Sequence, residues 1–260
     1  MTFKAIAYWW DRLIRSVKIR GVCGTMERLC SYTRMFVTPA GWRERRFDHL
    51  HGVQTSGRLA LYELGTKSPN LVYSVEYRPT PVREFVRIIA KLGIDYSKWV
   101  FIDLGAGKGR ALLLACTFPF KQVIGVEFSR ELANVAANNI TSHDPARECH
   151  DVSVICADAS TYVIPRGLTL IYLNNPFNGP VMERVVENLR ISLQEQAKDL
   201  YIVYWNPLCS EMFDRASFLT KTHQNKQYCV YRSDPRRNSV DRGHCQSHGQ
   251  DLAAYARNSE

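Results

Sequence analysis

The chain has 260 residues, of which 45% are hydrophobic, and a formal net charge of +9. This length suits one sizeable domain with attached segments. Because no run of 18 apolar residues occurs, a membrane-spanning helix is not expected.

The amino-terminal part of the chain carries much of the positive charge. Residues 1–50 contain ten Lys or Arg and four Asp or Glu. Apolar residues at helical spacing predict a helix over 5–20, and a second short helix is expected over 25–37. We interpret residues 1–75 as a basic helical extension. Its basic side could bind nucleic acid, an anionic membrane or an acidic protein, or it could simply be solvated.

The middle of the chain alternates between strands and helices. Thr80 and Pro81 form an N-cap and a first helical position, and they predict a helix that runs to about Leu92. Strands are expected at 99–103, 122–127, 151–157, 168–173 and 200–205, and helices at 109–118, 129–140 and 180–196. Alternation with near-continuous apolar strands is typical of a parallel sheet that is covered on both faces.

The last part of the chain has a different pattern. The stretch SFLTKTHQNKQYCVYR, residues 217–232, contains two extended segments around a polar turn, which predicts an antiparallel hairpin at one edge of the sheet. Residues 233–260 are polar and are expected to be disordered. Within this tail, His244, Cys245 and His248 lack a partner Cys pair, so no metal site is predicted. The eight cysteines form no C-x-x-C pair and suggest reduced thiols and a cytoplasmic location.

Three glycines follow the first strand of the expected sheet, in DLGAGKG. Gly105, Gly107 and Gly109 are spaced G-x-G-x-G, whereas a dinucleotide loop has G-x-G-x-x-G. Lys108 precedes Gly109 and not Ser or Thr, so the stretch is no triphosphate-binding loop. Asp103 stands two residues before the first glycine, where it would repel a pyrophosphate. This acid favours a ligand with a positive group, such as an ammonium.

DLGAGKG resembles the first motif of class I S-adenosylmethionine-dependent methyltransferases, and the resemblance runs from Tyr77 to Arg232. It implies a Rossmann-like, doubly wound α/β sheet of seven mostly parallel strands with an antiparallel last strand, in a domain over residues 76–232. It also implies S-adenosylmethionine as the cofactor, with the ribose hydroxyls on Glu127 and the adenine amine near Asp158. Glu127 could alternatively be only a helix N-terminal acid.

The fourth strand ends in YLNNPFNGP, which resembles two methyltransferase patterns. One is the N-P-P-[YF] motif of enzymes that act on adenine or glutamine, although one proline is missing here. The other is the Asn-Asn-Phe segment of telomeric-silencing-disruptor-like histone lysine methyltransferases. These resemblances imply catalytic roles for Asn174, Asn175, Pro176 and Phe177. Asn174 and Asn175 could alternatively form only a turn.

The stretch EYRPTP, upstream of the first strand, resembles a loop of related lysine methyltransferases that closes over the cofactor. It implies cofactor contacts from Tyr77 and Thr80. The whole arrangement also resembles uncharacterised bacterial class I methyltransferases. We therefore expect an N-methyltransferase that acts on a protein lysine, with an RNA or DNA base or a small molecule as the alternative acceptor. A non-catalytic basic binding module is the second class of function.

Overall fold

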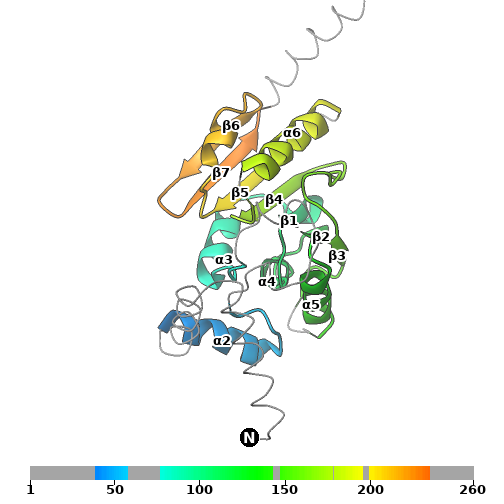
Figure 1. The fold of residues 1–260 in the computed structure, drawn as a ribbon, viewed down its shortest axis with the longest axis vertical. Coiled ribbons are helices and arrows are strands. Elements are labelled where there is room, and N and C mark those ends of the chain that lie inside the picture. The colour runs from blue at the N-terminus through cyan, green and yellow to red at the C-terminus, as the bar shows by residue number, and fades with distance from the viewer. Residues whose placement is uncertain (1–38, 58–76, 143–146, 178, 196–198, 235–260) are drawn as a thin grey trace, which may run out of the picture.

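The structure is a computed structural model that describes residues 39–57, 77–142, 147–177, 179–195 and 199–234. Figure 1 shows a sheet with helices on both sides, and α2 (Pro39–His51) below it. The helices expected over 5–20 and 25–37 and the tail beyond residue 234 lie outside the described residues. The sequence pattern did not predict α2, whose apolar residues are few and scattered.

Seven strands form one sheet in the order β3-β2-β1-β4-β5-β7-β6. They are β1 (Val100–Leu104), β2 (Gln122–Glu127), β3 (Val152–Cys156), β4 (Thr169–Asn174), β5 (Leu200–Trp205), β6 (Leu219–Gln224) and β7 (Tyr228–Ser233). The first five strands are parallel, whereas β7 is antiparallel to both β5 and β6. This confirms the seven-stranded Rossmann-like methyltransferase fold expected from the sequence. The strand order reverses beside β1, and ligands bind at such a switch point in open α/β sheets.

Helices cover the sheet on both faces. They are α3 (Val82–Lys91), η3 (Tyr96–Lys98), α4 (Arg110–Ala115), α5 (Arg130–Ser142), α6 (Gly179–Glu195) and α7 (Ser210–Asp214). Apolar residues of α3 and α4 pack in one core cluster, and those of α6 and α7 pack in the other, on the opposite face of the sheet. The helix expected over 109–118 is shorter. It begins one residue later, because Gly109 has a φ of 83° and is the N-cap, and it ends at Ala115.

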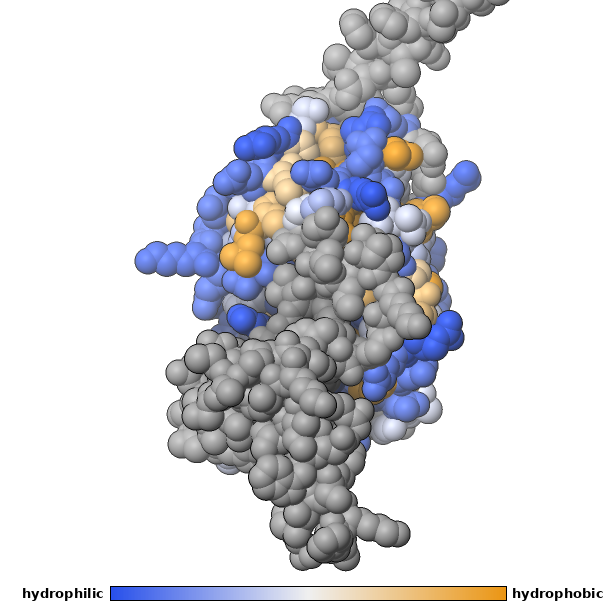
Figure 2. All heavy atoms as spheres, viewed as in Figure 1, coloured by the Kyte–Doolittle hydropathy of each residue, from blue (hydrophilic) through white to orange (hydrophobic). Residues whose placement is uncertain are grey.

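The surface of the described part of the chain is mainly hydrophilic on the face shown in Figure 2, with scattered apolar residues. Within the described ranges, no helix has both the length and the apolar character that a membrane span requires.

Candidate active site

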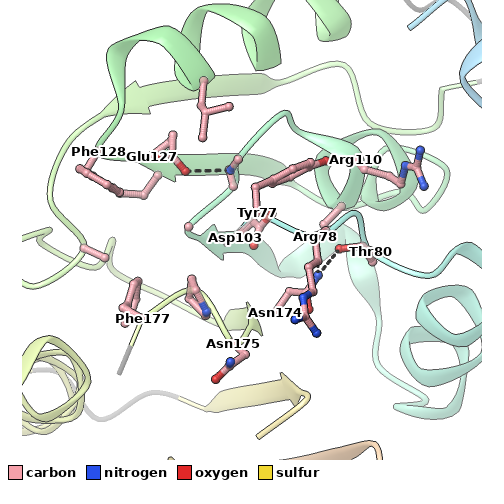
Figure 3. Close-up of a pocket in the computed structure, with 18 of the residues that line it drawn as sticks. Tyr77, Arg78, Thr80, Asp103, Arg110, Glu127, Phe128, Asn174, Asn175 and Phe177 are labelled. Carbon is pink, nitrogen blue, oxygen red and sulfur yellow. Dashed lines mark hydrogen bonds between the residues drawn. The ribbon is translucent and has the colours of Figure 1, made fainter. Parts of the chain in front are cut away.

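A pocket opens at the carboxyl ends of β1, β2 and β4, with about 790 Å³ of space including its open mouth. All of the site residues expected from the sequence line it except Gly109, which caps the adjoining helix. Figure 3 shows how their side chains surround the pocket.

The glycine loop after β1 requires residues without a Cβ atom. Gly105 and Gly107 have φ values of 88° and 55°, in the left-handed region that favours glycine. A Cβ atom on Gly105 would lie 2.2 Å from Pro176, and one on Gly107 would lie 2.3 Å from the ring of Tyr77. The loop therefore allows the backbone to approach both neighbours closely, and the sequence pattern located it correctly.

Glu127, at the end of β2, holds the glycine loop through a hydrogen bond from the loop's backbone. Its Oε2 accepts a hydrogen bond from the backbone N–H of Gly107 at 2.8 Å, and its Oε1 accepts one from Ser129 at 2.9 Å. Burial raises the pKa of this carboxyl group, and the backbone donors lower it in part. Each carboxylate oxygen has a second lone pair, so Glu127 can hold the loop and still accept two ribose hydroxyls.

Asp103, at the end of β1, carries a buried oxygen without a partner. Its side chain is 3% exposed, and no group in the described residues hydrogen-bonds to Oδ1. Burial and the nearby Glu127 carboxylate raise the pKa of Asp103 to about 8. A buried carboxyl oxygen without a hydrogen-bond partner lowers the stability of the folded protein unless a ligand supplies a donor. The ammonium group of S-adenosylmethionine has the donors and the charge that fit here.

Asp158 follows β3 at the far end of the pocket, where it is half-buried. Its Oδ1 accepts a hydrogen bond from the backbone N–H of Ser160 at 2.8 Å, which fixes the side chain in an Asx turn. Phe128, Leu132 and Ala157 line the same end and form an apolar wall suited to the adenine ring. Sequence reasoning missed these three residues, although Phe128 directly follows Glu127.

At the carboxyl end of β4, the two asparagines have different partners. The amide nitrogen of Asn174 donates to the backbone oxygen of Arg78 at 3.0 Å and to Oγ1 of Thr80 at 3.4 Å. Asn175 has a φ of 44°, and its Oδ1 accepts a hydrogen bond from the hydroxyl of Tyr204 at 3.1 Å. Asn174 therefore points toward the EYRPTP segment, whereas Asn175 points toward β5 (Figure 3).

Residues 51–57 and α2 support the glycine loop from behind. The hydroxyl of Tyr77 donates to the backbone oxygen of Thr55 at 2.7 Å, and Nζ of Lys108 donates to that of Ser56 at 2.8 Å. Lys108 also lies over the ring of Tyr77, 5.3 Å from its centre. These contacts fix Tyr77, the residue against which Gly107 of the glycine loop packs.

A buried ion pair between Arg110 and Asp48 also joins α2 to the start of α4. Arg110 is 2% exposed and lies 3.1 Å from Oδ1 of Asp48, and its Nε donates to Oγ1 of Thr55 at 2.6 Å. Asp48 in turn accepts hydrogen bonds from the hydroxyl and the backbone N–H of Thr55. Sequence reasoning missed this network, because Asp48 and Arg110 are 62 positions apart and show no pattern together.

Known methyltransferases are similar to part of this chain. Residues 97–198 match a family model described as "Putative methyltransferase". No curated protein matches the chain. The solved structures that match include a "putative RNA methyltransferase" from Pyrococcus horikoshii, with 23% identity over 66% of this chain and 92% of its own, and a TM-score of 0.43.

Two further structures cover similar shares of the chain. A SAM-dependent methyltransferase from Aquifex aeolicus is 15% identical over 59% of this chain and 93% of its own, with a TM-score of 0.43. A ribosomal protein L11 methylase from Lactobacillus delbrueckii subsp. bulgaricus is 16% identical over 60% of this chain and 80% of its own, with a TM-score of 0.44. Because these scores lie below 0.5, the fold assignment rests on the strand order and directions of this chain.

The family match, the strand order and the pocket lead to one conclusion. The chain is a methyltransferase with the class I fold, and S-adenosylmethionine is its cofactor. The partnerless oxygen of Asp103 and the close-packed glycine loop fit that cofactor. The position of the cofactor's individual groups on Tyr77, Thr80, Glu127 and Asp158 remains a prediction from the sequence.

Proposed function

We propose that this protein is an N-methyltransferase that methylates a nitrogen atom held at the carboxyl end of β4. The orientation of Asn174 carries the proposal. Both hydrogens of its amide nitrogen have partners in Arg78 and Thr80, so its Oδ1 is oriented as an acceptor. An amine that donates a hydrogen to this oxygen keeps its lone pair for the methyl carbon.

Positioning is the main contribution expected from the protein. The sulfonium of bound S-adenosylmethionine supplies an electrophilic methyl group without further activation. Correct alignment of the reacting groups can lower a barrier by about 7–11 kcal/mol. Here Asn174 and the backbone oxygen of Pro176 would hold the acceptor nitrogen. Phe177, which is 6% exposed, would form one wall beside it.

The charges around the pocket favour an acceptor nitrogen that is neutral at physiological pH. The acids that line it, Asp103, Glu127 and Asp158, belong to its cofactor half. A lysine must first lose its proton, at a cost of about 4 kcal/mol near pH 7.4. Burial raises the pKa of both Tyr77 and Tyr172, so neither phenol serves as a base near neutral pH. A base amine or an amide needs no prior deprotonation.

A protein lysine, the acceptor ranked first from the sequence, is the second candidate. Pro176, Phe177 and Val181 line the pocket with apolar surface that would suit the alkyl part of a lysine side chain. In this case the proton would leave to water before transfer.

The proposal is tested with methyl-labelled cofactor added to a cell lysate with the full-length protein. Separate digestion with nuclease and with protease then shows which polymer carries the label, and hydrolysis of the product identifies the methylated atom. We expect the label on nitrogen. Label on oxygen or carbon would contradict the proposal, and cofactor binding without any transfer would favour the non-catalytic binding module.

A further inference from the structure

An uninterrupted row of basic side chains runs along the outer face of α3. Arg83, Arg87 and Lys91 lie four residues apart, so they project from one face of the helix at successive turns. All three are exposed. Within the described part of the chain, none of them forms an ion pair or a hydrogen bond.

The buried side of α3 explains why this row faces outward. Phe85, Ile88 and Ile89 are buried, and the ring of Phe85 packs edge-on against Phe101 and Tyr172 of the sheet. These contacts determine the rotation of the helix about its axis. The basic residues therefore remain exposed to solvent. The helix that carries them packs beside α4 (Figure 1).

The row leads to the active site. α3 begins at Val82, two residues after Thr80, which lines the pocket and bonds to Asn174. Arg78 is exposed at the mouth of the same pocket, and its side chain lies beside Asn174 (Figure 3). We call Arg78 at the pocket mouth and the α3 row of Arg83, Arg87 and Lys91 the basic track.

Repulsion among the three basic residues of α3 opposes the stability of the helix. Like charges four residues apart destabilise a helix, and α3 contains two such pairs. Glu84 is the one acid of the helix. It is half-buried, and among the described residues it makes no ion pair with Arg87. The α3 row contains three regularly spaced cations, Arg83, Arg87 and Lys91, that form no ion pair among the described residues. Such a row complements a polymer with regularly spaced anions.

We propose that this basic track binds the phosphate backbone of a single-stranded nucleic acid and guides one of its bases into the pocket. The inference rests on the proposed function, because the bound nucleic acid would supply the neutral base nitrogen that Asn174 would hold. A single strand fits better than a duplex, because a base must leave its stack to enter a pocket of this kind. RNA and DNA share the phosphodiester chemistry, and the experiment distinguishes them.

The test measures binding of the full-length protein to labelled single-stranded RNA and DNA of the same mixed sequence. Four phosphate contacts predict a slope of about −2.8 for the logarithm of affinity against that of salt concentration, or an affinity loss of about fiftyfold between 50 and 200 mM. The triple variant Arg83→Gln, Arg87→Gln, Lys91→Gln retains one contact. Its affinity should fall only about threefold over the same range, and it should bind at least about tenfold more weakly at 50 mM.

The matched control removes the same charge elsewhere. Lys121, Arg166 and Lys226 are exposed. Lys121 and Arg166 precede β2 and β4, at the ends of these strands opposite to the pocket, and Lys226 lies in the turn between β6 and β7. With all three changed to Gln, binding should remain within about twofold of the wild type. An equal loss in both triple variants would overturn the proposal, since net charge alone would then explain it. Absence of oligonucleotide binding, or equal binding to polyglutamate or phosphatidylserine vesicles, would also overturn it.

Methylation of a phosphate-free nucleoside separates this inference from the proposed function. The α3 triple variant should bind the cofactor and methylate the nucleoside at the wild-type rate, while methylation of the oligonucleotide falls. If label is transferred to a protein lysine and the oligonucleotide is not bound, the inference that the basic track binds nucleic acid is wrong, and the proposed methyl transfer to nitrogen stands. If the track variant alone loses oligonucleotide binding but no nitrogen is methylated, the track stands and the proposed function fails.

Discussion

The two halves of the pocket satisfy their polar groups in different ways. In the cofactor half, Asp103 has a buried oxygen with no partner among the described residues, and its pKa is raised to about 8. In the acceptor half, the amides of Asn174 and Asn175 are bound to Thr80 and Tyr204. We therefore expect ligand binding in the proposed cofactor half to depend on the charge of the ligand, whereas hydrogen bonds within the protein already orient the amides of the proposed acceptor half.

This difference predicts that variants of the two halves change different quantities. Changes in the cofactor half should alter the dissociation constant of S-adenosylmethionine. Changes in the acceptor half should mainly alter turnover at saturating cofactor, because the amide groups they remove are proposed to hold the acceptor.

The largest effect is expected from Gly107→Ala. The new Cβ atom would lie 2.3 Å from the ring of Tyr77, in a backbone conformation with a φ of 55°. Since the loop or Tyr77 must move, calorimetry should show cofactor affinity lowered by more than about a hundredfold, equivalent to roughly 2.7 kcal/mol.

Gly93→Ala is the control, because Gly93 has a φ of 60° and an added Cβ meets nothing within 4 Å. It should lower stability by about 1–2 kcal/mol and leave cofactor affinity unchanged. Equal affinity in the two variants would disprove the close-approach argument.

Asn174→Ala should have the next largest effect, in the acceptor half. Loss of the oriented amide oxygen misplaces the acceptor nitrogen, and such errors can lower turnover by about a hundredfold. Rates at saturating cofactor should fall while the dissociation constant of the cofactor changes little. Asn225→Ala removes an amide that bonds to the backbone in the turn between β6 and β7, and it serves as the control. Unchanged turnover in Asn174→Ala would mean that the asparagine only supports the EYRPTP segment.

Asp103→Asn should lower cofactor affinity by about tenfold or more at pH 8, because a charge-assisted hydrogen bond is worth about 1.5–3 kcal/mol. In the wild type, a carboxyl group with a pKa of about 8 is mainly protonated at pH 6 and gains its charge as the pH rises. Affinity should therefore increase with pH from 6 to 8, by up to about tenfold per unit. The cofactor's own α-amino group has a pKa of about 7.7–8.0, so loss of its proton weakens the rise in affinity above about pH 7 and reverses it above about pH 8.

The same variant also tests the cost of burying Asp103. Because the folded-state pKa lies above that of the unfolded chain, the wild-type apoprotein should lose stability as the pH rises from about 4 to 8. Asp103→Asn should flatten both the stability profile and the affinity profile over this range. A wild-type affinity that does not change between pH 6 and 8 would contradict the assigned role of Asp103.

The smallest effect is expected from Tyr204→Phe, which removes the hydrogen bond to Asn175 and leaves the ring in place. A neutral hydrogen bond contributes about 1 kcal/mol, so turnover should fall by about fivefold if Asn175 helps to position the acceptor. Cofactor affinity should not change. A turnover equal to that of the wild type would limit the acceptor contact to Asn174.

Sequence patterns predicted the parts of this molecule that depend on local structure. The alternation of strands and helices predicted the sheet, the turn-separated segments predicted β6 and β7, and G-x-G-x-G located the loop after β1. Asp103 and Glu127 were found because each ends a strand, and the ends of neighbouring parallel strands meet at one edge of a sheet. The short α2 was missed, because its apolar residues show little helical periodicity.

Only the tertiary structure decided which side chains support and complete the pocket. The contacts of Arg110 with Asp48 and Thr55 join positions 62 and 55 residues apart. Asn174 and Asn175 are adjacent in sequence, yet they point to Thr80 and to Tyr204, because Asn175 adopts a left-handed conformation. Side-chain direction, burial and the resulting pKa depend on neighbours brought together by packing, and a sequence pattern contains no record of those neighbours.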